Sequence, residues 1–445
     1  MSQHTKKRVC VIGAGASGLC AAKFLSLDPD FFQFTVFERN NAIGGTWVYT
    51  DDTGNDEYGL PIHTSMYKNL RTNVPRELMN FPDYEKLGGD DGIHCCVTRE
   101  DMLKYLNDYA NFFDLRKFIQ FNTIVERITP ETADGDSATT WNVSVKNLKN
   151  NEVSKLKFDA VMVCNGHYAV PYIPAIPGIE TFPGKVLHSH SYRRPEEFSG
   201  QRVAVLGGYV SGIDISSEIS PYASEVYLSH NKNELKCELP SNVKQVSGVQ
   251  KIEGNKLVLN DGATIVADSF IYCTGYLYTY PFLDDSCNIV VDDNHVTPLY
   301  KHLINIHHPT MCFIGLANTV LPFLFFHVQV QYFLSSLKGV VKLPPRDVML
   351  EQLKSEVIPK KKDYHKFDCK QWAYYKELSR EGQFEPPANY YKNGFEAWKI
   401  LRGQFPVNSK YFKFVLLKDG ESVKYLKQDG SDFLDSEMKK CVFQC

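Results

Sequence analysis

The chain has 445 residues, of which 43% are hydrophobic and 23% are charged, and its formal net charge is −3. This length allows two or three domains, each with a core of its own. The charge balance does not indicate nucleic acid or an anionic membrane as a partner, and no apolar run reaches the roughly 18 residues typical of a membrane-spanning helix. We expect a soluble protein without a transmembrane anchor or a nucleic-acid partner, cytoplasmic as the sequence stands, or secreted if a leader has been removed.

Strand and helix patterns alternate from the N-terminus, which is typical of parallel βαβ units. KRVCVIG, GASGLCAAKFLSL and FQFTVFE predict a strand, a helix and a strand over residues 7–38. A loop rich in Gly, Asn and Asp follows at Asp51–Leu60, then a helix near Thr98–Phe113 and β-hairpins within Ile119–Phe158. A weaker copy of the first unit spans Arg202–Ser229, and such an internal repeat indicates two related folds in one chain.

The remaining segments complete the predicted domain plan. KLVLNDGATIVADSFIYCTG predicts a hairpin around Asp261-Gly262 and then a buried strand. The tail from Leu343 is rich in Lys and Tyr, and we expect it to wrap on the first domain. The predicted fold class is α/β, with two Rossmann-like dinucleotide-binding domains and β-hairpin additions. We expect the first domain at residues 1–175, an inserted second domain at 176–298, and the second part of the first domain with the wrapping tail at 299–445.

The first glycine motif, VIGAGASG, follows the first predicted strand and opens the first helix. Gly13 allows the tight turn, Gly15 lets the backbone approach a pyrophosphate, and Gly18 lets helix and strand pack closely. The helix N-terminus adds N–H donors near Ser17. Glu38 ends the next strand 20 residues after Gly18, where it can bind ribose hydroxyls and disfavours a 2′-phosphate by charge repulsion. This combination predicts an FAD or NAD site.

The second copy, VAVLGGYVSGIDI, has Tyr209 where the middle glycine of G-x-G-x-x-G belongs. Gly207 and Gly212 keep the turn and the packing position, Ser211 adds a hydroxyl, and Gly208 adds backbone freedom. We expect a shifted or looser NADP pyrophosphate at this loop, with the Tyr209 ring folded over the loop or toward the linker. The alternative interpretation is that Tyr209 simply packs between the domains.

Several segments resemble the flavin-containing monooxygenases, and they come in the same order. FPGKVLHSHSY contains F-x-G-x-x-x-H-x-x-x-Y, similar to the identifying sequence of that family, with Phe182, Gly184, His188 and Tyr192. MYKNLRTNVPRELMNFPDY resembles the segment around its active-site asparagine, CNGHY and CTGY resemble its two linkers between domains, and HPTMCFIGL with FFHVQVQYF resembles its return strand and helix. The resemblance covers roughly Arg8–Gly339 and suggests the compact, unanchored insect or yeast members, some of which oxidise pyrrolizidine alkaloids at nitrogen.

The resemblance implies FAD and NADPH as cofactors. In the implied reaction NADPH reduces FAD, the reduced flavin and O2 form a C4a-hydroperoxide, and a soft nucleophile takes its distal oxygen. A tertiary amine, an alkaloid or a sulfide is such a nucleophile, so the expected partners are a small molecule of this kind and O2. The cofactor carries the chemistry while the protein orients it and excludes water. We predict no metal, since the sequence has no H-x-x-x-H or zinc-type cluster.

Asn73 is the predicted catalytic residue, because an amide both donates and accepts hydrogen bonds and can hold a flavin peroxide without protonating it. Ser229, His230 and Lys232 follow the second βαβ strand and are available for the 2′-phosphate of NADPH. The bidentate Arg common in relatives is missing and Lys acts as a point charge, so we predict a modest preference for NADPH. By resemblance, further FAD contacts are Gly45, Trp47, Thr72, Asn73, Val125 and Gln329, and further NADP contacts are Tyr172, Tyr209, Thr274 and Gly275. Gln329 and Gln331 are candidates to cap the flavin edge, and the alternative is that either is a surface helix residue.

Other roles and activities stay open at this point. His188 and His190 invite a general-base role, but we expect a structural one, since their segment positions the linker between domains in the family. Baeyer–Villiger monooxygenases, which oxygenate ketones, usually show Trp where Tyr192 stands, and an NADPH oxidase that releases H2O2 is a further alternative. A flavin disulfide reductase needs a redox Cys pair, and none is spaced for it. The substrate and the oligomeric state, including a homo-oligomer, are also open.

Overall fold

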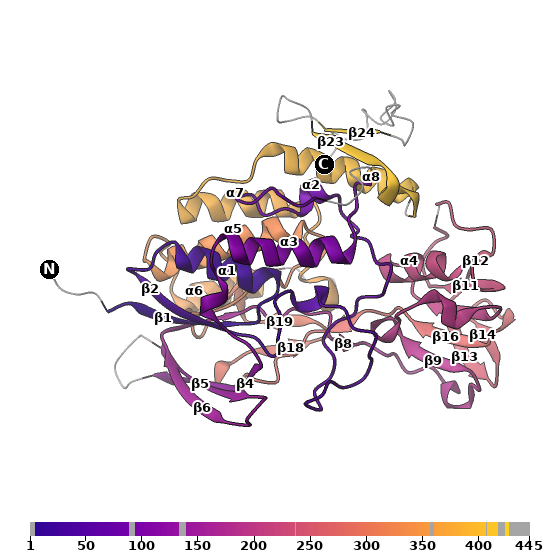
Figure 1. Ribbon diagram of the computed structural model, residues 1–445, viewed down its shortest axis with the longest axis horizontal. Helices are drawn as coiled ribbons and strands as arrows, with labels where there is room; N and C mark the ends of the chain where they lie inside the picture. The colour runs from indigo at the N-terminus through magenta and orange to yellow at the C-terminus, as the bar shows by residue number, and fades with distance from the viewer. Residues whose placement is uncertain are drawn as a thin grey trace.

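The computed structural model describes residues 5–88, 94–132, 139–235, 237–356, 360–405, 407–416 and 423–426. A seven-stranded sheet and a five-stranded sheet form the centres of two α/β units that lie side by side (Figure 1). The predicted α/β class with two Rossmann-like units is confirmed. We call the unit around the larger sheet the first unit and the unit around the smaller sheet the second unit.

The larger sheet is built around the first predicted βαβ unit. β1 (Lys7–Ile12) pairs in parallel with β2 (Phe32–Phe37) on one side and with β7 (Ala160–Val163) on the other. These strands are largely buried apolar runs, because helices and other strands cover both faces of a central parallel sheet. The edges are β3 (Ile119–Gln120) and the series β22 (Met311–Phe313), β21 (Ile304–Asn305) and β20 (Leu299–Tyr300), of which β21 and β20 run antiparallel to their neighbours.

The smaller sheet repeats this plan with parallel strands throughout. β10 (Arg202–Leu206) lies at its centre, between β11 (Glu225–Ser229) and β16 (Ser269–Tyr272). The edges are β12 (Val243–Val246) and β9 (Lys185–His188). The strands predicted within Arg202–Ser229 are therefore confirmed, and each unit turns from its central strand into a helix through a glycine loop.

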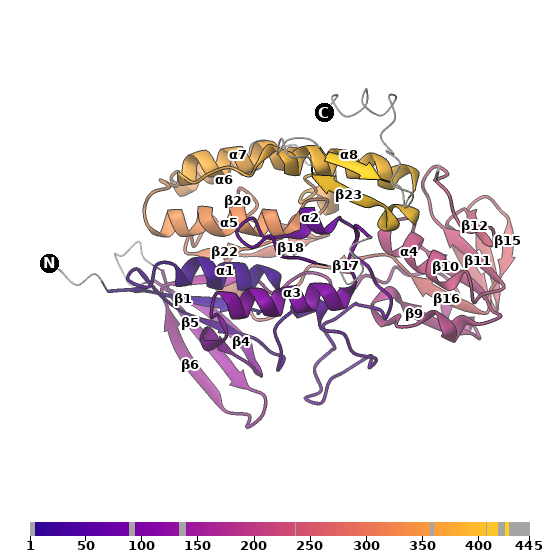
Figure 2. The same cartoon turned by 45° about the horizontal axis from the view of Figure 1, so that its top comes forward.

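Antiparallel strands extend both units. The hairpins predicted within Ile119–Phe158 form a three-stranded sheet, and the turn at Asp261-Gly262 joins two strands of another. Two short strands, β8 (Val170–Pro171) and β17 (Tyr276–Leu277), pair with each other and lie between the two large sheets (Figures 1 and 2). The other strands are β4 (Thr123–Thr132), β5 (Thr139–Asn147), β6 (Val153–Phe158), β13 (Val249–Glu253), β14 (Lys256–Leu259), β15 (Thr264–Val266), β18 (Val290–Asp292), β19 (His295–Thr297), β23 (Lys413–Leu416) and β24 (Val423–Leu426).

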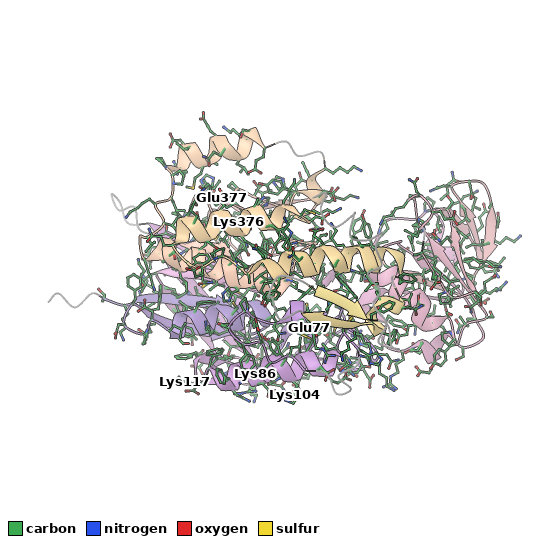
Figure 3. The ribbon with its side chains drawn as sticks, turned by 90° about the horizontal axis from the view of Figure 1, so that it is seen from above. Glu77, Lys86, Lys104, Lys117, Lys376 and Glu377 are labelled. Atoms are coloured by element: carbon green, nitrogen blue, oxygen red, sulfur yellow. The ribbon has the colours of Figure 1, made fainter. Side chains whose placement is uncertain are left out.

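Helices stack on one face of the larger sheet. α1 (Ala16–Ser26) contacts α3 (Arg99–Phe112) and α5 (Pro322–Leu337), and α5 in turn contacts α7 (Lys370–Gly382). Figure 3 shows the two ends of this stack, with Lys104 of α3 along one edge and Lys376 and Glu377 of α7 on the far side. The remaining helices are α2 (Arg76–Met79), α4 (Val210–Ile219), α6 (Arg346–Ser355) and α8 (Asn389–Gln404).

The start of α3 shows how the sequence sets a helix boundary. Thr98 accepts a hydrogen bond from the backbone N–H of Asp101, and the Asp101 carboxylate accepts one from the backbone N–H of Thr98. This capping box satisfies two donors that a helix N-terminus otherwise leaves free. The helix predicted near Thr98–Phe113 is confirmed.

The tail after Leu343 bridges the two units. Tyr374, Tyr375 and Trp398 are buried in the same core as α1 and α5 of the first unit. Beyond α8, Lys410 forms an ion pair with Asp214 on α4 of the second unit. The tail therefore does more than pack on the first domain as the sequence predicts, because it also contacts the second.

The hydrophobic cores only partly follow the predicted domain limits. Tyr278, Phe282, Cys287 and Val296 pack in one cluster with residues of β1, β2 and β7. The core of the first unit thus includes chain that precedes residue 299. The boundaries at 175 and 298 stay predictions.

Candidate active site

The first glycine loop connects β1 to α1, and each of its three glycines faces close backbone. A Cβ on Gly13, whose φ is +98°, would lie 2.7 Å from the carbonyl oxygen of Cys164, and one on Gly18 would lie 1.8 Å from that of Gly13. A Cβ on Gly45 would lie 3.0 Å from the Cα of Gly15, so a second loop presses against the first. The glycines therefore leave room for the chain itself, and the loop can approach a pyrophosphate without side chains in the way.

The N-terminus of α1 has no side-chain cap. Its capping position is Gly15, and among the described residues no side chain accepts a hydrogen bond from the first turn. Ser17, inside that turn, points elsewhere: its Oγ donates to the carbonyl oxygen of Cys164 at 3.4 Å. Because α3 has a complete capping box and α1 has none, the first turn of α1 is suited to a bound anion.

Glu38 stands at the end of β2, beside this loop. Its Oε2 accepts a hydrogen bond from the backbone N–H of Ala14 at 2.7 Å, and its Oε1 accepts one from Asn40 at 2.8 Å. Burial raises the pKa of this carboxyl, and the two backbone hydrogen bonds oppose that shift. Each oxygen keeps a further lone pair, so Glu38 can accept hydrogen bonds from ribose hydroxyls as the sequence predicts.

The second glycine loop, between β10 and α4, makes the same backbone contacts as the first loop at several equivalent positions. Gly207 N–H donates to Ser229 O at 2.9 Å, as Gly13 N–H donates to Phe37 O at 2.8 Å. A Cβ on Gly207, whose φ is +133°, would lie 2.3 Å from the carbonyl oxygen of Cys273, and one on Gly212 would lie 1.6 Å from that of Gly207. The strand registers place Phe37 opposite Ile12 and Ser229 opposite Leu206. This correspondence equates His230 with Glu38 and Tyr209 with Gly15.

Tyr209 is 66% exposed, so the interpretation that it packs between the domains is wrong. Its ring lies beneath the ammonium group of Lys232, which is 2.8 Å from the ring centroid. Gly208 also differs from the expectation of backbone freedom, because its φ is not positive. Its missing side chain makes room for His230, whose ring atoms would lie 2.8 Å from a Cβ at Gly208.

The two predicted linkers are fastened to each other. Tyr172 N–H donates to Gly275 O at 2.9 Å, and the Thr274 hydroxyl donates to Tyr172 O. β8 and β17 continue this contact as a short antiparallel pair. Chain crosses between the units at these two points, so the orientation of the units depends on this pairing.

The F-x-G-x-x-x-H-x-x-x-Y segment is a structural frame for the second unit. Phe182 packs in its core, and a Cβ on Gly184 would lie 2.0 Å from the carbonyl oxygen of Asp268. His188 Nδ1 accepts a hydrogen bond from the backbone N–H of His190 at 3.0 Å and caps the turn η4 (Ser189–Ser191). Tyr192 is 1% exposed and donates from its hydroxyl to Glu218 of α4 at 2.9 Å. Each position thus has a packing or hydrogen-bonding role, which supports the structural interpretation of His188.

Asn73 is held through its backbone, and its side chain is left available. The Trp398 indole donates to Asn73 O at 2.9 Å, and the neighbouring Thr72 is buried with its hydroxyl donating to Val74 O at 2.9 Å. Within the described part of the chain, the side-chain amide of Asn73 has no hydrogen-bond partner. Thr72 N–H donates to Val97 O at the start of α3, and α3 contacts the turn η1 (Gly45–Trp47) that touches the first glycine loop. Through these contacts, the segment of Asn73 is connected to η1, which carries the predicted FAD residues Gly45 and Trp47.

Gln329 and Val125 are both buried. Gln329 Oε1 accepts from Gly315 N–H at 2.9 Å, and its Nε2 donates to the Tyr374 hydroxyl at 3.0 Å. This amide therefore joins the turn after β22 to α7, and its predicted flavin contact stays a prediction. Val125 lies on β4 within a hydrophobic cluster, and its contact also stays a prediction. Gln331, named with Gln329 as a cap for the flavin edge, instead lines a surface groove with Phe24, Asp28 and Lys338.

A small hollow, with room for no more than about one water, lies at the carboxyl ends of β7 and β22. This edge of a parallel sheet is where cofactors bind in doubly wound folds. Burial lowers the pKa of His63, His167 and His188, three imidazoles near the linkers, to about 4. These rings are neutral at physiological pH, so none of them is a strong acid toward a group bound nearby. The hollow is lined by Val163, Asn165, Gly166, His167, Tyr280, Phe313, Ile314, Gly315 and Leu316.

Sequence reasoning missed Arg193, which fastens the loop Asp51–Leu60 to the second unit. Its guanidinium donates to Thr50 O at 2.8 Å and to Asp52 O at 3.1 Å, and also to His190 O at 2.8 Å. Arg193 is only 4% exposed. The signal was its position directly after the motif that ends at Tyr192, but the partners are backbone carbonyls from a distant segment, which no pattern reveals.

Among the helices of the described residues, none has both the length and the apolar character needed to span a bilayer. The described residues also bring together no group of three or more His, Cys, Asp or Glu side chains that could hold a metal ion.

Comparison with known proteins identifies the family. Residues 6–236 and 231–380 match the family model of flavin-binding monooxygenase-like proteins. Flavin-containing monooxygenase FMO GS-OX-like 2 of Arabidopsis thaliana is 36% identical over 397 residues, which cover 83% of each chain. Flavin-containing monooxygenase FMO GS-OX4 of the same plant is 39% identical over 372 residues, 79% of this chain and 77% of that protein. The solved S-allyl-L-cysteine S-oxygenase of Allium sativum has a TM-score of 0.82 and 32% identity, over 92% of this chain and 95% of that chain.

The chain belongs to the flavin-containing monooxygenase family. It is a flavoprotein monooxygenase, and the predicted cofactors FAD and NADPH are confirmed with the family. The residues present fit both groups: the first loop with Glu38 suits FAD, and the second loop, where His230 replaces the acid and Lys232 lies nearby, suits NADPH. The individual contacts stay predictions. A small-molecule substrate and O2 agree with this monooxygenase family.

Proposed function

We propose that this flavin-containing monooxygenase uses NADPH and O2 to oxygenate soft nucleophilic heteroatoms, the sulfur of a thioether or the nitrogen of a tertiary amine. The observation that carries the proposal is the pair of glycine loops with matching backbone contacts, one beside a carboxylate and one beside a lysine. Two different dinucleotides, an FAD and a phosphate-bearing NADPH, match this difference in charge. The similarity to an S-allyl-L-cysteine S-oxygenase supports a sulfide as the first substrate to test.

The chain itself supplies orientation and a suitable polar environment. Bound flavin, once reduced, supplies the chemistry that activates O2. The Asn73 amide can hold a polar oxygen next to the flavin without giving up a proton, because an amide is not an acid in this pH range. The neutral imidazoles of His63, His167 and His188 add no acid to the region. A substrate nucleophile then needs access rather than activation by a base.

We propose a modest preference for NADPH over NADH. His230 takes the position of Glu38 in the second loop, so the repulsion that a carboxylate exerts on a 2′-phosphate is absent there. Lys232 lies two residues further on and supplies one positive charge. A single ammonium group binds phosphate less specifically than a bidentate Arg, hence the modest size.

The test is coupled turnover by the FAD-loaded enzyme. NADPH oxidation, O2 consumption and H2O2 release are measured with a thioether such as an S-alkyl cysteine, with a tertiary amine, with a ketone, and without substrate. We expect about one sulfoxide or N-oxide per NADPH, with little H2O2, when the right substrate is present. H2O2 release that no substrate reduces would identify an NADPH oxidase, and a lactone or ester from the ketone would identify Baeyer–Villiger chemistry; either result contradicts the proposal.

A further inference from the structure

Lys232 carries a positive charge that its surroundings hold in place and leave unneutralised. Its Nζ donates to Gly208 O at 3.2 Å and lies over the face of the Tyr209 ring. Among the residues that the structure describes, Lys232 takes part in no ion pair. Many other lysines of this chain are paired with carboxylates, Lys185 with Glu197 for example. A carbonyl and an aromatic face orient an ammonium group without cancelling its charge.

The other two candidates for the 2′-phosphate are occupied by the protein. Ser229 is fully buried, and its hydroxyl donates to Ser247 O at 2.8 Å. His230 Nε2 is hydrogen-bonded with Gln245 Oε1 at 3.2 Å, and its Nδ1 accepts from the backbone N–H of Lys232 at 3.3 Å. With both ring nitrogens engaged, His230 fixes the turn that carries Lys232. Lys232 is thus the one residue of the three that keeps a donor for an incoming anion.

The position of this ammonium group follows from the repeat. His230 corresponds to Glu38, so the turn after β11 lies at the ribose end of the second loop, as the turn after β2 does in the first. Lys232 also reaches back to the loop itself, through Gly208 O. Its charge therefore lies between the loop that receives the pyrophosphate and the strand end that receives the ribose.

We propose that Tyr209 is a positioning residue for coenzyme selectivity, which holds the ammonium group of Lys232 where it binds the 2′-phosphate of NADPH. This inference rests on the proposed use of NADPH. A lysine on the surface samples many rotamers, and fixing it in one costs entropy when a ligand binds. The Tyr209 ring fixes it beforehand through the cation–π contact. The residue that replaces the middle glycine of the loop thereby adds a function that a glycine cannot provide.

The role assigned to Tyr209 depends on its aromatic face and not on its hydroxyl. Phe offers a similar ring, so Tyr209→Phe keeps the contact, whereas Tyr209→Leu removes it with a side chain of moderate size. Lys232→Met removes the charge and keeps an unbranched stem. Two matched controls lie elsewhere in the second unit: Tyr222→Leu changes an exposed tyrosine, and Lys251→Met changes an exposed lysine.

The experiment measures the dissociation constants of NADP⁺ and NAD⁺ for the FAD-loaded protein, by calorimetry without turnover, for each variant. We expect Lys232→Met to weaken NADP⁺ binding about tenfold, as for a lost charge-assisted hydrogen bond. Tyr209→Leu should weaken NADP⁺ about two- to fivefold, the range of an exposed cation–π contact. NAD⁺ binding should stay within about twofold in every variant, and Tyr209→Phe and both controls should match the parent protein.

Three results would overturn the inference. The first is Tyr209→Leu binding NADP⁺ as the parent does, and the second is Tyr209→Leu weakening NAD⁺ and NADP⁺ equally, which would show a general effect on the loop. The third is Tyr209→Phe behaving as Tyr209→Leu, which would assign the role to the hydroxyl. Failure of the proposed use of NADPH looks different, because the parent FAD-loaded protein would then not bind NADP⁺ and NADPH would not reduce its flavin. Failure of the proposed oxygenation alone would leave NADP⁺ binding and flavin reduction intact and would show only in the products.

Discussion

The Trp398 indole holds the backbone of Asn73, while the side-chain amide of Asn73 has no hydrogen-bond partner among the described residues. A polar side chain with a fixed backbone and no internal partner is suited to act on a ligand. The segment around it is held at three more points, since Thr72 bonds to Val97 and Val74, and Arg71 pairs as an isolated bridge with Thr98. At the scale of single residues, Asn73 is therefore the strongest candidate for contact with the reacting part of the flavin.

Asn73→Asp tests this role with a nearly isosteric change. A carboxylate repels the developing negative charge on a flavin-bound oxygen, where an amide donates to it. We expect oxygenated product to fall about a hundredfold and H2O2 to rise per NADPH consumed, with FAD content unchanged. Product, H2O2 and bound FAD are measured together.

The matched control for this substitution is Asn107→Asp on α3. Among the described residues, Asn107 hydrogen-bonds to Leu103 O and with Arg116, both close in the sequence. Asn107→Asp should therefore leave the amounts of oxygenated product and of H2O2 per NADPH unchanged. An Asn73→Asp enzyme that binds FAD and stays fully coupled would show that Asn73 does not act on the flavin.

The helix α4 is the element that connects the second unit to the rest of the chain. Asp214 and Glu218 lie one turn apart on it, and both face other segments: Asp214 accepts from Tyr67 and Lys410, and Glu218 accepts from Asn69 at 3.0 Å. Tyr192 also donates to Glu218. Two carboxylates on one helix face thus receive donors from the first unit, the tail and the motif segment. A helix that starts at the second glycine loop is in this way oriented by contacts at its other turns.

Glu218 should make the stability of the protein depend on pH. Burial raises its pKa from 4.5 to about 7, against the lowering effect of the Tyr192 and Asn69 hydrogen bonds. Below about pH 4.5 the carboxyl is protonated in both the folded and the unfolded state; between about 4.5 and 7 only the folded state keeps the proton, so the free energy of unfolding falls as pH rises. Glu218→Gln removes this titration and should flatten the decline.

Urea unfolding from pH 5 to pH 8 measures the effect of Glu218→Gln, with Glu234→Gln at an exposed position as control. Glu77 on α2, whose pKa burial also raises to about 7, contributes a decline of the same sign. The imidazoles of His63, His167 and His188, whose pKa burial lowers from 6.5 to about 4, contribute the opposite trend below about pH 6.5. The effect of Glu218 is therefore the difference between the two proteins: the free energy of unfolding of the parent minus that of Glu218→Gln should fall from pH 5 to pH 7. A difference that does not change with pH would contradict the prediction.

At the scale of the whole molecule, three further contacts add to those of Tyr67 and Asn69 with α4 in fixing the two units relative to each other. The linkers pair through β8 and β17, Arg193 fastens the loop Asp51–Leu60, and Lys410 in the tail pairs with Asp214. The tail also bonds to the first unit near this point, since Lys410 O accepts from Cys96 N–H at 3.3 Å. Such multiple ties suit an enzyme whose two cofactors must meet in one orientation.

The pair of Lys410 and Asp214 should therefore contribute to stability across the units. The Lys410 side chain is 9% exposed and that of Asp214 is 22% exposed, so removing the lysine leaves a largely buried carboxylate without its cation. We expect Lys410→Met to lower the free energy of unfolding by about 3 kcal/mol. Adding Asp214→Asn should recover part of this loss, because the unpaired charge is then gone.

Thermal and urea unfolding of the parent, the two single variants and the double variant complete this cycle, with Lys256→Met as an exposed control. Because the protein has two units, thermal unfolding and urea unfolding must each show a single transition before the free energies of unfolding are compared. Strictly additive effects of the two substitutions would show that the pair is not coupled.

The sequence predicted the elements with strong local signals. The strands at residues 7–38, the helix capped by Thr98 and the repeat at Arg202–Ser229 were all found as expected, because apolar runs, caps and glycine turns act over a few neighbouring residues. For Gln331 and Tyr209 the sequence left alternatives open, since the contacts of each depend on which distant segment the fold brings alongside. Gln331 faces a groove near Lys338, and Tyr209 faces Lys232 across the loop.

The sequence by itself determined the fold class, because glycines at fixed spacing after a strand leave few alternatives to a dinucleotide turn. The resemblance of its motifs to those of flavin-containing monooxygenases implied the family and both cofactors. Only the tertiary structure decided how the second loop differs from the first. The pairing of β10 with β11 places His230 at the position in the second loop that corresponds to Glu38 in the first. The His230 imidazole fills the space beside Gly208, and Lys232 lies over the ring of Tyr209. Spacing along a chain specifies a turn, but the charge that a turn presents depends on side chains that meet only when parallel strands are in register.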